Sequence, residues 1–475
     1  MLFSWLLARN NNGKFFYRIE DTDRTRLVPE SVRSMIEDFA WLGLDIDEGP
    51  TTADLQRAGY GSEGGGGFRG GEYPYIASLR LERYREVAEI LIRDGFAYRC
   101  DCSPEKLEAE RQEQITRGET TGYSGFCRNR NLPATDPHVV RFLIPEAQAV
   151  SFQDAIRGPI TWDPVVLRDM VILKTDGFPT YHLGATVDDH DMRITHILRG
   201  EEWISTTPLH CLIYRALGWS QPVIAHLPVI LGHDGKKLSK RHGATFCKTY
   251  REEGYLPEAL LNYLLLQGWS PGEGSDKEIF TREEMIASFS MDRVKAGSSV
   301  FSFDKLKWVN GVYMRQTPDD ELAKLTKPFL TAAGLSVDET RLKQIMPYVR
   351  ERMLESLKDA LPFVEFLFVN QVNPDFAELV KSKTSIEDIS RILTAAIRMF
   401  QQVSPFTPAT VETTLRDLAS TLGLSTKIVF MTVRIAVTGR KATPPLFESL
   451  VVLGRDRALT RLTDALGKAD IASPR

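Results

Sequence analysis

Helical periodicity in the second half of the chain restricts its fold more than any other feature. From about residue 257 onward, apolar residues recur at the spacing of amphipathic helices, most clearly over 321–330, 342–369 and 386–403. The first half instead mixes helical patterns with short strand-like runs. We therefore expect an α/β front half followed by an all-α rear half. A chain of 475 residues is too long for one core and predicts two to four domains.

Local patterns predict several elements of the front half. Residues 14–19 form a short strand-like run, and a helix with Pro29 in its first turn follows it. Residues 59–71 are rich in glycine and predict a loop. A second helix is expected over 84–92, and 194–198 is predicted to be a buried strand.

Composition narrows the class of protein. The hydrophobic content of 43% and the charged content of 26% are typical of a soluble globular protein, and no apolar run approaches the ~20 residues that span a bilayer. We therefore expect no membrane association. Three of the five cysteines are clustered, which favours a reducing, cytoplasmic compartment and a metal site over disulfides. The net charge of −4 neither supports nor excludes a nucleic-acid partner, because binding depends on local basic surface.

A basic loop carries the clearest chemical pattern. Residues 236–243 read KKLSKRHG and follow the turn sequence GHDG at 232–235. Lysine ammonium groups can neutralise charge on a leaving pyrophosphate, and glycine lets the backbone approach closely. A basic run by itself is more often a solvated face. Two other segments favour the functional interpretation: YRIEDTDR at 17–24 and ILRGEEW at 197–203.

In this order and separation, the three segments resemble the catalytic domain of class I aminoacyl-tRNA synthetases, specifically the glutamyl-tRNA synthetases of bacterial type. The resemblance is densest over 14–48 and 179–269 and thin after about residue 320. A helical rear half also resembles this family, whereas glutaminyl enzymes carry β-barrels there. The resemblance implies a Rossmann-like catalytic domain over 1–72 and 180–245, an acceptor-end-binding insertion over 73–179, a stem-contact domain over 246–320 and a helical anticodon-binding domain over 321–475.

The resemblance implies an ATP-dependent ligase. In such an enzyme, glutamate attacks the α-phosphate of ATP, which is bound with Mg²⁺, and forms glutamyl-adenylate and pyrophosphate. The terminal ribose of tRNA(Glu) then takes the glutamyl group and AMP is released. Orientation and charge stabilisation carry most of such a reaction. The loop residues Lys237, Ser239 and Lys240 are expected to bind ATP, and both lysines are expected to be catalytic.

Four residues are expected to form the glutamate pocket, and two of them, Tyr181 and Trp203, match family positions. Glu20 is expected to pair with the substrate ammonium, and Arg199 to bind the γ-carboxylate through both arms of its guanidinium. Tyr181 and Trp203 are expected to line the pocket. Some relatives carry an asparagine where this chain has Ala185, so that contact is not transferred. Taken singly, Glu20 could be an exposed acid and Arg199 a surface ion-pair partner, but their order along the chain favours the functional interpretation.

The clustered cysteines point to a metal. Cys100 and Cys102 are spaced C-x-C, and Cys127 follows them. Zinc takes about four ligands, and some bacterial glutamyl enzymes supply a histidine two residues after the last cysteine, where this chain has Asn129. A related pattern supplies a tyrosine instead. The resemblance thus implies a structural Zn²⁺ site of Cys100, Cys102, Tyr123 and Cys127, with a relic of a lost site or free buried thiols as alternatives.

Contacts with tRNA are expected in the rear half. Arg350, Arg352 and Arg434 are expected to contact bases or phosphates of the anticodon loop, where unpaired bases are read on their edges. The alternative for each arginine is a solvated ion pair. By the same resemblance, the enzyme is expected to be a monomer.

The second class I motif, H-I-G-H or a relative, is expected before Glu20 and is not in this sequence. We expect the cellular protein to start upstream of Met1 and to be active; a true truncation would instead impair adenylation. Three other functions compete: a glutaminyl enzyme, a short paralogue that glutamylates a modified base of tRNA, and a catalytically impaired tRNA-binding protein. The helical character of the rear half argues against a glutaminyl enzyme, which carries β-barrels there. The presence of a rear half argues against the short paralogue, which lacks an anticodon domain.

Overall fold

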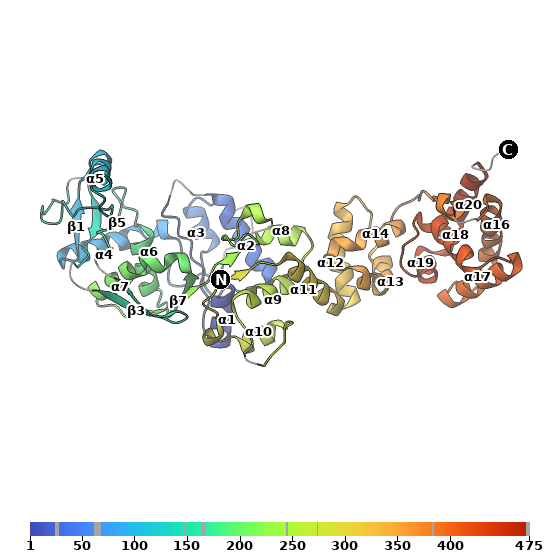
Figure 1. Ribbon diagram of the computed structural model, residues 1–475, viewed down its shortest axis with the longest axis horizontal. Helices are drawn as coiled ribbons and strands as arrows, with labels where there is room; N and C mark the ends of the chain where they lie inside the picture. The colour runs from blue at the N-terminus through green and yellow to red at the C-terminus, as the bar shows by residue number, and fades with distance from the viewer. Residues whose placement is uncertain are drawn as a thin grey trace. The chain divides into compact units, whose positions relative to one another are not determined.

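The computed structural model describes residues 1–23, 28–60, 68–135, 137–145, 149–162, 167–243, 246–272, 274–381 and 384–471 (Figure 1). The chain divides into two compact units. The first comprises Met1–Lys248 and Leu261–Ser302, and the second comprises Thr249–Leu260 and Phe303–Arg475. Within the described residues, no helix combines the length and the apolar character needed to cross a membrane.

The first unit mixes strands and helices. Its strands are β1 (Ala97–Cys100), β2 (Val139–Phe142), β3 (Val150–Asp154), β4 (Gly158–Trp162), β5 (Val171–Leu173), β6 (His196–Gly200), β7 (Val223–Leu227), β8 (Ile230–Leu231) and β9 (Ser299–Val300). Its helices include α1 (Leu2–Asn10), α2 (Pro29–Leu42), α3 (Thr52–Arg57), α4 (Leu81–Arg93), α5 (Pro104–Thr116), α6 (Tyr181–Asp191), α7 (Thr207–Ala216) and α10 (Arg282–Ser288). Short 3₁₀ turns are η1 (Ala77–Leu79), η3 (Glu201–Thr206), η4 (Lys240–His242) and η5 (Met291–Arg293).

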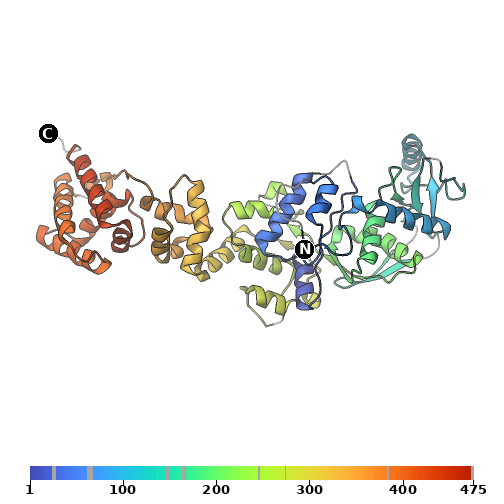
Figure 2. The same cartoon turned by 180° about the vertical axis from the view of Figure 1, so that it is seen from behind.

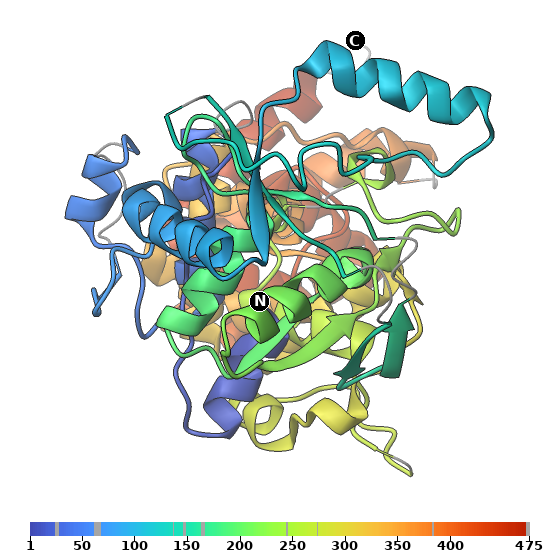
Figure 3. The ribbon, with the colours of Figure 1, turned by 90° about the vertical axis from the view of Figure 1, so that its left-hand side faces the viewer.

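A four-stranded sheet in the order β4-β3-β7-β6 supports the site described below. The β3–β4 hairpin, teal in Figure 3, is antiparallel, whereas β7 runs parallel to both β3 and β6. The turn η3 and helix α7 form the crossover between β6 and β7, as parallel neighbours require. A separate antiparallel sheet has the order β1-β2-β5.

One apolar core joins these elements. Tyr84 and Leu91 of α4, Phe142 of β2, Leu183 of α6 and Ile224 of β7 belong to the same buried cluster. These side chains come from helices and strands far apart in the sequence. The cluster therefore ties α4, α6 and the two sheets of the first unit together.

The second unit is helical. Helices α8 (Cys247–Glu252) and α9 (Pro257–Gly268) each contribute residues to both units. The remaining helices are α11 (Phe303–Gln316), α12 (Asp319–Ala332), α13 (Glu339–Val349), α14 (Leu361–Val364), α15 (Ala377–Lys381), α16 (Ile386–Gln402), α17 (Pro408–Leu422), α18 (Thr426–Thr438), α19 (Leu446–Leu453) and α20 (Arg455–Ile471), with 3₁₀ turns η6 (Arg350–Arg352), η7 (Leu357–Ala360) and η8 (Glu365–Leu367).

The predicted helical pattern explains how the C-terminal helices pack. In α16, Ile389, Ile392, Leu393, Ala396 and Phe400 are buried, and this spacing places them on one face of the helix. Helices α16 and α20 pack against each other, as the orange-to-red end of the ribbon in Figure 2 shows. The α/β front half and helical rear half expected from the sequence are confirmed: in the described part of the chain, the last strand ends at Val300.

Some local predictions were wrong in their bounds. The strand predicted at 194–198 is β6, which begins two residues later and is only partly buried, because it lies at the edge of its sheet. Residues 14–19 make isolated parallel bridges to two different segments rather than a continuous strand. The helical run at 342–369 is broken into short pieces, with Pro347 in the last turn of α13 and Pro362 in the first turn of α14. Part of the loop predicted over 59–71, residues 61–67, lies outside the described residues.

Candidate active site

A pocket of about 1070 Å³ lies in the first unit. It is bordered by α1, by the segment that carries Glu20, by the start of α6 and by β6. Glu20, Tyr181, Ala185 and Arg199 all line it. The pocket therefore brings together three of the four residues that the sequence predicted for glutamate binding. Trp203 contacts one of them, Tyr181.

Glu20 lies in an acidic part of this pocket. Its side chain keeps 36% of its surface exposed and contacts Arg18 at 3.4 Å. Arg18 also pairs with the buried pocket residue Asp189 at 2.6 Å. The surrounding protein desolvates the Glu20 carboxylate, and this effect, with the charges of Asp189 and Asp188, raises its pKa despite Arg18. A cationic ligand group here would lower that pKa again, which suits the binding of an ammonium.

Tyr181, Arg199 and Trp203 form one contact group. Tyr181 begins α6, Arg199 lies on β6, and Trp203 follows in η3. The Tyr181 and Trp203 rings lie 4.3 Å apart, and Arg199 Nη1 donates to the Tyr181 hydroxyl at 3.4 Å. Burial and the nearby Glu20 raise the pKa of Tyr181, so its hydroxyl stays neutral. The group presents an aromatic wall and a guanidinium to the same space.

Arg199 has further partners that the sequence did not reveal. Its Nε donates to His226 Nε2 at 3.1 Å, its Nη2 donates to Thr207 Oγ1 at 2.6 Å, and its Nη1 lies 3.4 Å from His210 Nδ1. His226 stands directly opposite Arg199 in the register of β6 and β7. No local pattern marks these residues, because only strand pairing and the position of α7 bring them to Arg199.

The predicted ATP loop forms a tight turn after β8. Gly232 donates to the Lys236 carbonyl and Leu238 donates to the Ile230 carbonyl, each at 2.8 Å. Gly235 has a φ of 73°, a left-handed conformation that favours glycine. The loop is thus held by backbone contacts on both sides of its tip.

Two of the three predicted ATP ligands have described side chains. Lys237 Nζ pairs with Glu202 at 2.8 Å, and Glu202 is the residue before Trp203. Ser239 donates its backbone N–H to His242 Nδ1 at 3.0 Å. Lys240 opens η4, but its side chain lies outside the described residues. The ion pair of Lys237 therefore links the loop to the segment that carries the glutamate pocket.

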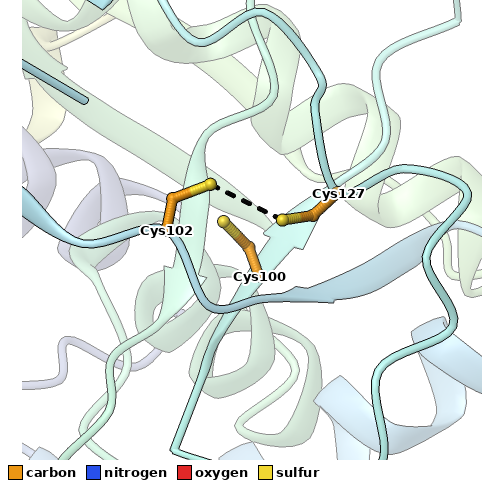
Figure 4. Close-up of side chains that lie close together, drawn as sticks. All are labelled: Cys100, Cys102 and Cys127. Carbon is orange, nitrogen blue, oxygen red and sulfur yellow. Dashed lines mark hydrogen bonds between the residues drawn. The ribbon is translucent and has the colours of Figure 1, made fainter. Parts of the chain in front are cut away.

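Three cysteines converge at the end of β1. The sulfur atoms of Cys100, Cys102 and Cys127 all lie within 4.8 Å of one another (Figure 4). The Tyr123 hydroxyl lies 3.4 Å from Cys100 Sγ and 3.8 Å from Cys102 Sγ, and it accepts the Cys127 N–H at 2.8 Å. Three thiols at such distances match zinc in chemistry, and the phenol oxygen brings the set to four, the number that a tetrahedral site takes. Burial and the hydrogen bonds with Cys100 and Cys127 raise the pKa of Tyr123 and keep its hydroxyl neutral.

The surroundings favour a thiolate at Cys100 but not at Cys102, where burial and a hydrogen bond with Cys127 raise the pKa to about 12. Burial disfavours the ionised form of Cys100, but hydrogen bonds from Tyr123, the Cys102 backbone and Arg141 outweigh it and lower the pKa of Cys100. The Arg141 guanidinium also lies 3.8 Å from the centre of the Tyr123 ring. A buried cation beside the ligands offsets part of the negative charge that three thiolates would bring.

The predicted anticodon arginines differ in their surroundings. Arg350 pairs with Asp319 at 2.6 Å and donates to the Thr317 carbonyl. Arg434 donates to Thr443 Oγ1 at 2.5 Å and to the Pro444 carbonyl at 2.9 Å. Arg352 is exposed and lies 5.4 Å from the centre of the Phe363 ring. Of the three, Arg352 offers the most open guanidinium, and the anticodon role of all three stays a prediction.

Comparisons with known proteins agree over nearly the whole chain. The family described as "tRNA synthetases class I (E and Q), catalytic domain" matches residues 1–308, and the "Anticodon binding domain" family matches 321–466. The glutamate–tRNA ligase of Dehalococcoides mccartyi strain BAV1 is 42% identical over 475 residues, covering 98% of this chain and 93% of its own. That of Borrelia recurrentis is 40% identical and covers 98% and 91%.

Solved structures give the same result for the three-dimensional fold. A crystal structure of a glutamate tRNA ligase from Elizabethkingia meningosepticum, in complex with its amino acid, superposes with a TM-score of 0.82 at 31% identity. The alignment covers 98% of this chain and 95% of that one. Because sequence relatives and this structure match the chain over nearly their full lengths, the chain belongs to the glutamate–tRNA ligases, a family of class I aminoacyl-tRNA synthetases.

Proposed function

We propose that this glutamate–tRNA ligase activates L-glutamate in the pocket formed by Glu20, Tyr181, Arg199 and Trp203. As a member of its family it uses ATP and acts on tRNA(Glu). The observation that carries the assignment is the position of Arg199, whose guanidinium borders the pocket beside the Tyr181–Trp203 wall. A γ-carboxylate placed there would meet a fixed cation on one side and aromatic rings on another.

Each end of the substrate has a matching group. Arg199 would bind the γ-carboxylate through charge-assisted hydrogen bonds, and Glu20 would bind the ammonium. Fixing both groups leaves the α-carboxylate of glutamate as the nucleophile toward the α-phosphate of ATP. Because the protein supplies little covalent chemistry, holding this geometry is its main contribution to the rate.

The loop at 236–243 would hold the nucleotide. Lys237 is paired with Glu202 through two exposed side chains, and such pairs are weak. Lys237 can therefore exchange Glu202 for phosphate oxygens, and Ser239 and Lys240 complete the proposed contacts. Mg²⁺ bound with ATP would neutralise phosphate charge alongside the lysines.

Cys100, Cys102, Cys127 and Tyr123 would hold a structural Zn²⁺, because four protein ligands leave no position open for substrate. Such an ion would tie β1 to the segment carrying Tyr123 and Cys127 and so stabilise this part of the first unit. The proposal includes a cytoplasmic, monomeric enzyme, because thiol ligands need a reducing compartment and a monomer is the family expectation. Light scattering of the purified protein tests the monomer.

The glutamate pocket is tested by ATP–pyrophosphate exchange, measured with tRNA(Glu) present. Arg199→Lys keeps the positive charge but loses the paired N–H donors with which a guanidinium binds both oxygens of a carboxylate. The KM for glutamate should therefore rise roughly 10-fold or more while the KM for ATP changes little. Arg93→Lys, an exposed arginine at the end of α4 that pairs with Asp94, is the matched control. An unchanged KM for glutamate in Arg199→Lys would refute the assignment.

A further inference from the structure

We propose that His226 and His210 are positioning residues that fix the Arg199 guanidinium and leave its charge unpaired, so that the pocket accepts a carboxylate and rejects a carboxamide. The inference rests on the proposed role of Arg199 as the ligand of the γ-carboxylate. It adds a specificity function for two buried histidines that the reaction itself does not use.

Strand register places the first histidine. Arg199 and His226 are paired neighbours on the parallel strands β6 and β7, so their side chains leave the same face of the sheet. His226 is fully buried, and its ring has three side-chain partners: Asp154 Oδ2 lies 2.6 Å from Nδ1, while Arg199 Nε and Thr207 Oγ1 each lie 3.1 Å from Nε2. Asp154, also fully buried, accepts the backbone N–H groups of Ile156 and Arg157 at 2.9 Å each. These backbone hydrogen bonds hold the Asp154 carboxylate in place, and Asp154 in turn holds the His226 ring.

The direction of each hydrogen bond follows from Arg199. A guanidinium can only donate, so His226 Nε2 must accept, and His226 Nδ1 then carries the hydrogen that Asp154 accepts. The same reasoning applies to His210. Its Nδ1 accepts from Arg199 Nη1 at 3.4 Å, so its Nε2 donates to His182 Nδ1 at 3.0 Å. Both imidazoles that contact the guanidinium are neutral acceptors in this arrangement.

The environment keeps these rings neutral. Burial and the nearby charge of Arg199 lower the pKa of His210 far below its usual range. Burial also lowers the pKa of His226, although Asp154 opposes the shift. The pKa of His182 falls for the same two reasons as that of His210. A neutral imidazole can accept from the guanidinium, whereas a protonated one would have no lone pair to offer.

Arg199 consequently differs from other arginines of the same unit. Arg18 is paired with Asp189, Arg80 with Asp188, and Arg157 with Glu201. Arg199 instead contacts His226, His210, Thr207 and Tyr181. Within the described residues, no carboxylate oxygen lies within 4.0 Å of its guanidinium nitrogens. The Asp154 carboxylate is kept one imidazole away.

This arrangement has a consequence for substrate choice. A partly desolvated guanidinium without an internal counter-ion gains most from an anionic ligand. A carboxamide would lose that charge interaction, and its NH₂ group would face N–H donors if the amide turned the wrong way. Replacing His226 by an uncharged residue that cannot accept a hydrogen bond from Arg199 should therefore weaken glutamate binding. It should also reduce the preference for glutamate over glutamine.

Two substitutions at one position separate positioning from packing. In His226→Asn, the amide nitrogen stands near the position of Nδ1 and keeps a donor for Asp154, but the acceptor for Arg199 is lost. In His226→Gln, the amide oxygen reaches near Nε2 and keeps the acceptor, while the donor for Asp154 is lost. His138→Asn is the matched control, because His138 is a partly exposed histidine of the first unit that does not line the pocket.

The assay is ATP–pyrophosphate exchange with tRNA(Glu) present, with glutamate or glutamine as substrate. His226→Asn should raise the KM for glutamate roughly 10-fold while the KM for ATP is kept, and the ratio of glutamate to glutamine activation should fall. In His226→Gln, the KM for glutamate should return most of the way to the wild-type value. A merely structural histidine would give equal losses in both variants, with lower kcat or melting temperature and an unchanged KM; that result, or wild-type behaviour of His226→Asn, overturns the proposal.

The outcome for Arg199 distinguishes this inference from the proposed function. If Arg199→Lys leaves the KM for glutamate unchanged, the pocket assignment itself fails. If Arg199→Lys raises that KM but both His226 variants behave like wild type, the pocket stands and the positioning role is wrong. His210→Gln tests the Arg199–His210 contact independently. Its KM for glutamate should rise less than that of His226→Asn, because the Arg199–His210 contact is longer than the Arg199–His226 contact.

Discussion

Two helical glycines of the second unit should respond in opposite directions to the same substitution. Gly311 lies buried in α11, and a Cβ built on it would stand 2.6 Å from the Leu354 carbonyl oxygen. Gly467 lies in α20, and a Cβ there would meet nothing within 4 Å. Both residues are helical, so the comparison separates the effect of packing from that of helix propensity.

The magnitude follows from two opposing effects. Alanine in place of glycine stabilises a helix interior by about 1 kcal/mol. At Gly311 the clash is with backbone, which cannot rotate away, so overpacking should cost about 3 kcal/mol, the upper part of its usual range. The net loss for Gly311→Ala is therefore about 2 kcal/mol. Gly467→Ala has no clash and should gain about 0.5–1 kcal/mol, at the lower end because the residue lies in the last turn.

Calorimetric melting of the full chain tests this pair. For a unit of this size, 1 kcal/mol corresponds to about 2–4 °C, so Gly311→Ala should lower the melting temperature of the second unit by about 4–8 °C. Gly467→Ala should raise the same transition slightly. If Gly311→Ala melts at or above the wild-type temperature while Gly467→Ala behaves as expected, α11 does not approach Leu354 this closely and the reasoning is refuted.

Three further predictions concern pH, metal and tRNA. Stability of the first unit should fall as the pH drops below about 6.5, because the unfolded chain takes up protons that His210, with its strongly lowered pKa, cannot bind when folded; melts at pH 5 and 7 should show a smaller difference in His210→Gln. Purified protein should contain about one Zn²⁺ per chain, and Tyr123→Phe should weaken binding in a chelator titration because it removes the fourth ligand; far less than one equivalent in the wild type rejects the site. Arg352→Gln should weaken charging of tRNA(Glu) and relax the anticodon preference because it removes an exposed guanidinium charge, and unchanged kinetics on anticodon variants would reject that role.

Local sequence patterns predicted a large part of the architecture. The amphipathic spacing of α16 and the proline start of α2 were sufficient to locate both helices. Propensity and periodicity act over one or two turns, so they were reliable where a helix buries a single face. They failed at 342–369, where prolines and tertiary contacts divide a helical pattern into short pieces.

The order and spacing of three motifs were enough to predict the family, because they identify residues whose chemistry a glutamate–tRNA ligase needs. The same reasoning singled out Arg199 and the three cysteines. It could not show that the cysteine sulfurs meet within 4.8 Å, since this depends on how β1 packs beside a distant loop.

The partners of Arg199 mark the boundary between the two kinds of information. By itself, the sequence determined the α/β and helical halves, the family and the identity of the residue expected to bind the γ-carboxylate. The tertiary structure alone decided that Arg199 faces His226, His210 and Thr207 and not a carboxylate. The physical reason is that register between parallel strands is set by the packing of the crossover helix α7, which no local pattern along β6 or β7 specifies.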